Sequence, residues 1–62
     1  MDQDNLRNRC LTYQEDEGVK SIYLCRCTLL EAGYYSKFKK GSKDLSKKFY
    51  ILVDDFLQSK GY

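Results

Sequence analysis

"GYYSKFKKGSKDLSKKFY", residues 33–50, interleaves aromatic side chains with lysines. Tyr35 and Phe38 stand three residues apart, so a helix places both rings on one face. Gly41 predicts the end of that helix, because glycine tolerates the left-handed backbone found at helix ends. Six lysines and one aspartate lie between positions 37 and 48. The rings indicate a core, and the lysines form either a solvated face or a surface for a polyanion.

Downstream of this stretch, the pattern predicts the last helix of the chain. Ser46 is its expected N-cap, after an apolar anchor at Leu45, and Gly61 is its expected stop. Apolar residues repeat every three to four positions along it: Phe49 or Tyr50, Val53, Phe56 and Leu57.

Upstream, residues 21–28 read SIYLCRCT and are rich in residues that favour strands. Leu24, Cys25 and Thr28 nevertheless keep the helical period, and Ser21 is a suitable cap. We therefore predict a helix here. The connection that follows, "LLEA" at residues 29–32, leads into the lysine-rich helix.

The first helix is predicted from an apolar stripe at positions 6, 10 and 13, namely Leu6, Cys10 and Tyr13. Asp4 or Asn5 is expected to cap its start, and Gly18 to close it in the left-handed conformation. The whole chain is thus expected to be all-α, with four or five helices.

The length of 62 residues predicts one domain, residues 1–62, with a small core. No apolar run approaches the ~18 residues of a membrane span, and no signal-peptide core follows the N-terminus, so we expect a cytoplasmic protein without membrane contact. Residues 1–18 carry two cations and five anions, whereas residues 19–62 carry nine cations and four anions. The net charge of +2 therefore conceals a concentrated basic segment.

The residue types argue against catalysis and against a metal site. The chain has no histidine, and Asp54 and Asp55 are adjacent in a helix, where neighbours point apart. Three cysteines cannot supply the four ligands of structural zinc. We expect no enzyme activity, metal, cofactor or small-molecule substrate. Cys10 and Cys25 are expected to be buried and Cys27 to be the exposed thiol.

The middle of the chain resembles the phage-repressor type of helix-turn-helix domain (Cro-like, XRE family), without a gap from about Val19 to Leu57. The matching residues are Leu24-Cys25, Leu30, Tyr35, Phe38, Lys39-Lys40-Gly41-Ser42-Lys43 and Asp44-Leu45-Ser46. The resemblance implies a compact, lambda-repressor-like domain of four or five helices, with the motif at about residues 21–40. Its turn needs a left-handed residue, usually glycine, at Leu29.

The resemblance also implies a DNA-binding surface: Ser21, Ala32, Gly33, Tyr34, Ser36, Lys37, Lys40 and Lys43. Tyr35 is expected in the core and Tyr23 packed. Tyr34 is expected on the exposed side of the recognition helix, where it either contacts a phosphate or thymine methyl or simply covers apolar surface. Ala32 and Gly33 cannot make bidentate bonds to bases, and Glu31 repels phosphate unless it accepts from a cytosine amino group.

The resemblance implies binding of double-stranded DNA by a small transcriptional regulator, of the repressor type, from a phage or mobile element. The alternative is a protein-interaction module, such as an antirepressor, adaptor or inhibitor, on the same scaffold after loss of DNA reading. Apolar residues in the last helix also predict a weak homodimer through the segment 51–62: Ile51, Leu52, Phe56 and Tyr62.

Overall fold

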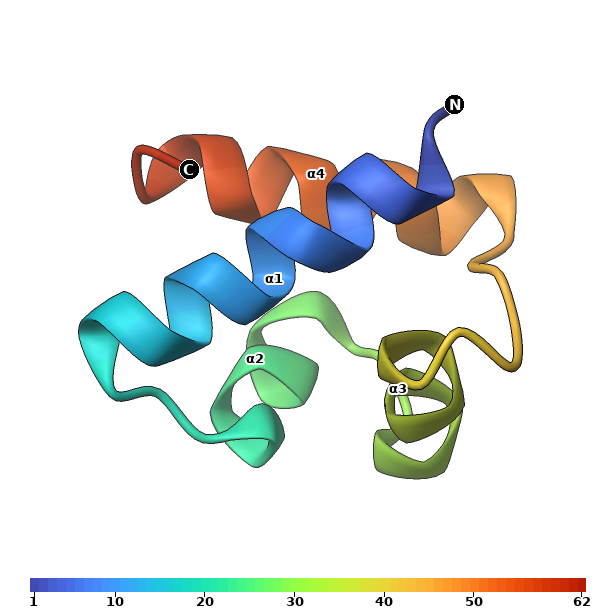
Figure 1. Cartoon of the computed structure of the whole chain (residues 1–62), viewed down its shortest axis with the longest axis horizontal. Helices are drawn as coiled ribbons and strands as arrows, with labels where there is room; N and C mark the ends of the chain where they lie inside the picture. The colour runs from blue at the N-terminus through green and yellow to red at the C-terminus, as the bar shows by residue number, and fades with distance from the viewer.

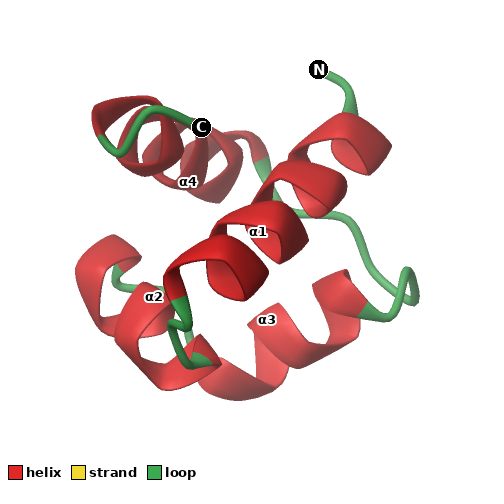
Figure 2. Ribbon diagram, turned by 60° about the vertical axis from the view of Figure 1, so that its left-hand side comes forward, coloured by secondary structure: helices red, strands yellow, loops and turns green.

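The computed structural model describes all 62 residues and contains four helices and no strand (Figures 1 and 2). The helices are α1 (Gln3–Glu17), α2 (Ser21–Thr28), α3 (Ala32–Lys39) and α4 (Lys47–Ser59). Figure 1 shows α1 passing in front of α4, with α2 and α3 beneath them. The all-α prediction is confirmed, and residues 21–28 are helical although they favour strands in isolation.

The core lies where the four helices meet, and every helix contributes at least two buried apolar residues to it. Its eleven members are Leu6, Cys10, Tyr13, Leu24, Cys25, Leu30, Tyr35, Phe38, Leu45, Val53 and Leu57. The predicted core positions of Tyr35, Phe38 and Leu45 are confirmed, as is the burial of Cys10 and Cys25 and the exposure of Cys27. Apolar spacing therefore identified the inner face of each helix.

The start of α1 differs from the prediction. Asp2 is the N-cap, and its carboxylate accepts a hydrogen bond from the Asn5 backbone N–H at 2.9 Å. The Tyr50 hydroxyl also bonds both backbone groups of Asp2, which fixes the chain terminus against α4. The prediction of Asp4 or Asn5 as cap was wrong, since α1 starts at Gln3 and Asp2 makes both the local capping bond and the contact with Tyr50, 48 residues away. The left-handed closure at Gly18 is confirmed, with φ of 64°.

The start of α2 also differs, since the N-cap is Lys20 and Ser21 is the first helical residue. The Ser21 hydroxyl is occupied by side chains of α1 and α3 instead of capping its own helix. Ser46 precedes α4 as predicted, although its side chain makes no capping bond.

A three-residue connection, residues 29–31, turns the chain from α2 to α3. Leu29 adopts the left-handed conformation with φ of 60°, as predicted, and is the only non-glycine residue with positive φ. Its N–H bonds the Cys25 carbonyl and closes α2. The leucine side chain is 81% exposed, so it gains little from packing.

Leu29→Gly is expected to raise the free energy of unfolding by about 0.5–1 kcal/mol. The substitution removes about 1–2 kcal/mol of left-handed strain, and the extra freedom of glycine in the unfolded chain offsets part of this. Thermal unfolding followed by circular dichroism should show a higher Tm. Leu11→Gly, at a right-handed position inside α1, is the matched control and should lower stability by about 1 kcal/mol. A lower Tm for Leu29→Gly would contradict the strain at this turn.

Candidate nucleic-acid interface

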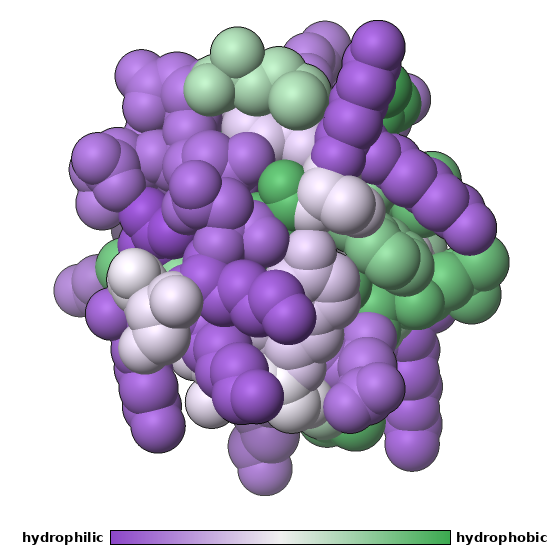
Figure 3. All heavy atoms as spheres, turned by 90° about the vertical axis from the view of Figure 1, so that its right-hand side faces the viewer, coloured by the Kyte–Doolittle hydropathy of each residue, from purple (hydrophilic) through white to green (hydrophobic).

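The side of α3 opposite the core is exposed and basic. Tyr35 and Phe38 are completely buried, so the helix shows its other residues to solvent. We define the basic face as six of the exposed residues of α3 and the loop that follows: Ala32, Gly33, Ser36, Lys37, Lys40 and Lys43. Figure 3 shows long hydrophilic side chains projecting from the side of the molecule on which α3 and this loop lie.

The lysines of the basic face have no ion-pair partner within the chain. All three salt bridges involve Arg7 or Arg9, and no lysine takes part in any of them. Asp44 is the one acid among the lysines of residues 37–48, and it pairs with Arg7 at 3.2 Å. The positive charges of Lys37, Lys40 and Lys43 therefore remain available to an anion from outside.

Arg7 of α1 also supports α3 from behind. Its Nε donates to the Phe38 carbonyl, and its guanidinium lies 4.7 Å from the centre of the Phe38 ring. The Arg7 side chain is only 12% exposed, so most of it is packed inside the domain. This one residue holds the end of α3 and the loop through Asp44. Arg7 lay off the apolar stripe, and nothing in its sequence position indicated this role.

A small depression lies on each side of the exposed edge of α3. One has a volume of about 290 Å³ and is lined by Ser21, Ala32, Tyr35, Ser36, Lys39 and Lys40. The other has a volume of about 270 Å³ and is lined by Glu31, Gly33, Tyr34, Lys37 and Lys43. Seven of the eight predicted site residues thus lie on α3 and the adjoining loop. The eighth, Ser21, lines the depression beside Ala32 and Ser36.

A hydrogen-bond network joins the start of α2 to α3. Ser21 Oγ accepts from Gln14 Nε2 at 3.2 Å and from Lys39 Nζ at 3.3 Å. Gln14 Nε2 also donates to the Val19 carbonyl, and Gln14 Oε1 accepts from the Tyr35 hydroxyl. Burial raises the pKa of Tyr35, which keeps that hydroxyl protonated as a donor. The network fixes the relative position of α2 and α3. The sequence pattern had not indicated this role for Gln14.

Tyr34 does not project freely from α3 but covers apolar surface, one of the two roles expected of it. It is half-buried, and its hydroxyl donates to the Asp44 carbonyl at 3.1 Å and accepts from the Ser46 N–H at 2.8 Å. Its ring packs edge-on against Phe49 at 5.9 Å between centroids. The Lys43 ammonium lies 5.2 Å from the centre of the same ring. Tyr34 therefore anchors the loop and orients Lys43.

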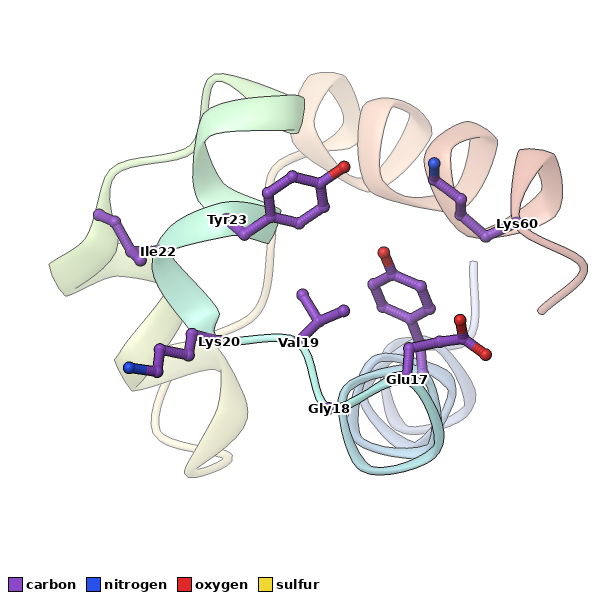
Figure 4. Close-up of a pocket in the computed structure, with 8 residues that line it drawn as sticks. Glu17, Gly18, Val19, Lys20, Ile22, Tyr23 and Lys60 are labelled. Carbon is purple, nitrogen blue, oxygen red and sulfur yellow. The ribbon is translucent and has the colours of Figure 1, made fainter.

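The largest cavity of the structure, about 620 Å³, lies away from the basic face. It is an open groove between the end of α1, the turn after it, the start of α2 and Lys60 (Figure 4). Figure 4 shows Val19 between the two sides, with Tyr23 on α2 and Lys60 at the end of α4. Tyr23 is 47% exposed, so the expectation that it packs was wrong. Exposed Ile22 extends this apolar groove.

No group of three or more His, Cys, Asp or Glu side chains lies close enough together to hold a metal ion. None of the four helices combines the length and apolar character needed to cross a bilayer. Comparison with protein-family models, curated proteins and solved structures finds no match to this chain.

Proposed function

We propose that the chain binds double-stranded DNA through the basic face, with α2 and α3 acting as a helix-turn-helix. The observation that carries this proposal is the set of three unpaired lysines, Lys37, Lys40 and Lys43, on the exposed edge of one helix and its loop. The helix is held rigidly from behind by Phe38 and Arg7.

The dimensions of DNA support this function. The major groove of B-DNA, about 12 Å wide, admits one α-helix. Ala32 and Gly33 at the front of α3 are small, which allows close approach to the base edges, and the lysines then face phosphates. The N-cap of α2, Lys20, makes no side-chain capping bond, so the backbone N–H groups of Ser21 and Ile22 are free to meet a phosphate.

We further propose that this DNA binding serves transcription, as a small repressor-type regulator of a phage or mobile element acting in the cytoplasm. The support is the likeness of the segment 19–57 to helix-turn-helix repressors, together with the left-handed turn at Leu29.

A mobility shift with a random-sequence duplex tests the proposal. Retention is expected at about 50 mM salt and should be lost progressively by about 200 mM, because each phosphate contact releases counterions. Binding that does not change with salt, or no complex at the lower salt at about 0.1 mM protein, would contradict it.

Protein interaction is the second candidate function, and the groove beside Val19 and Tyr23 favours it. A partner offering an apolar side chain would match the apolar residues of the groove, whose charged lining residues are Lys20, Lys60 and Glu17. The mobility shift separates the two functions, since a protein-interaction module does not need to retain DNA.

The weak homodimer remains a prediction, and the exposed apolar surface available for it is smaller than expected. Phe56 and Tyr62 pack edge-on against Tyr13 of the same chain, at 5.5 and 5.3 Å between ring centroids. Ile51 is exposed and Leu52 half-buried, so these two remain for a second copy. Sedimentation with and without duplex tests the dimer, and a strict monomer in both conditions would exclude it.

A further inference from the structure

Glu31 occupies an unusual place at the front of α3. It is the N-cap of the helix, yet its side chain makes no capping hydrogen bond and no ion pair. Its Oε1 lies 3.3 Å from the point that a Cβ on Gly33 would occupy. The carboxylate is therefore bent over the first turn of α3 and does not point away from it.

The glycine at position 33 gives the Glu31 carboxylate room over the first turn of α3. The backbone of Gly33 has no positive φ, so its conformation does not require glycine. Glycine inside a helix costs about 1 kcal/mol relative to alanine. The missing Cβ instead leaves room for Glu31 to lie over the exposed side of the helix.

The depression beside Gly33 has opposite charges on its wall. It is lined by Glu31 together with Lys37 and Lys43. Lys37 is one helical turn beyond Gly33, on the same side of α3. Lys43 is held over the Tyr34 ring. A ligand here meets one acceptor group and two donor groups.

A G·C base pair presents the matching pattern in the major groove. Guanine N7 and O6 are adjacent acceptors at one side, and the cytosine amino group is the donor at the other side. In an A·T pair the adenine amino donor lies between two acceptors, adenine N7 and thymine O4, so a carboxylate there meets neighbouring lone pairs.

We propose that Glu31 and Lys37 read one G·C pair, Glu31 accepting from the cytosine amino group and Lys37 donating to guanine. This inference rests on the proposed DNA binding and names the sequence that the site prefers. An A·T pair places the Glu31 carboxylate beside two acceptors, so much of the discrimination comes from rejection of this base pair.

Selection of bound duplexes from a random library tests the inference, with wild type compared with Glu31→Gln and Gly33→Ala. The wild-type chain should enrich a fixed G·C pair, and exchanging it for A·T should weaken binding about 5- to 150-fold. Glu31→Gln should bind random duplex more tightly and lose this preference. Gly33→Ala keeps every charge and should weaken the preference only slightly, because its Cβ shifts the flexible Glu31 carboxylate by a few tenths of an ångström.

Glu15→Gln is the matched control, since it removes the same charge from an exposed position on α1. It should leave the preference unchanged. Enrichment of the same site by wild type and Glu31→Gln, or of an A·T pair by wild type, overturns the inference while DNA binding stands. Failure of the wild-type chain to retain any duplex overturns the inference and the proposed function together.

Discussion

Replacing Lys37, Lys40 and Lys43 with alanine together should weaken binding to every duplex by roughly 500-fold at about 0.1 M salt, if each lysine neutralises one phosphate. The slope of log K against log salt should become shallower by about 2.7, since each lost contact contributes about 0.9. None of the three lysines is paired or buried, so the fold should be unaffected. Fluorescence anisotropy of a labelled duplex at several salt concentrations measures both quantities.

Single substitutions provide the matched comparison. Lys40→Ala should reduce the slope by about 0.9, whereas Lys60→Ala, which removes the same charge at the far end of α4, should leave the slope unchanged. Equal effects of these two variants would mean that overall charge, and not the basic face, attracts the duplex. An unchanged affinity in the triple variant would mean that the three lysines do not bind DNA and only form a solvated surface.

Phe38→Ala should remove a large part of the stability of the fold. The ring is completely buried, and removing a buried phenylalanine side chain costs about 3–5 kcal/mol. A domain of this length has a total stability of only about 3–9 kcal/mol. The variant also loses the contact between the ring and the Arg7 guanidinium. Thermal unfolding followed by circular dichroism should show a much lower Tm than that of the wild type.

Ile51→Ala is the control for this prediction, because Ile51 is 45% exposed on α4. It should change stability by less than about 0.5 kcal/mol. A Phe38→Ala chain that melts cooperatively near the wild-type temperature would contradict the packing of α3 against α1.

The sequence was sufficient to predict the features that depend on local spacing. The four helices follow from apolar residues three to four positions apart, and Gly18 from the preference for glycine in a left-handed helix end, whereas the left-handed Leu29 was expected from the resemblance to helix-turn-helix domains. Local spacing also placed Lys37 and Lys40 outside once Tyr35 and Phe38 were assigned to the core.

Features that depend on distant contacts could not be predicted in this way. The cap at Asp2 is tied to Tyr50, and the Tyr34 hydroxyl bonds backbone groups ten and twelve residues away. The network of Gln14 joins three helices through one amide. A long polar side chain has the same sequence pattern whether it reaches solvent or a partner across the core, so only the fold distinguishes the two.

The most direct test of DNA binding by the basic face is the change in backbone amide chemical shifts when a random-sequence duplex is added at about 50 mM salt. The largest changes should occur at residues 21, 32, 33, 36, 37, 40 and 43, and they should reverse as salt is raised. No change at any amide, or changes confined to the groove around Val19, Ile22 and Tyr23, would contradict DNA binding by the basic face.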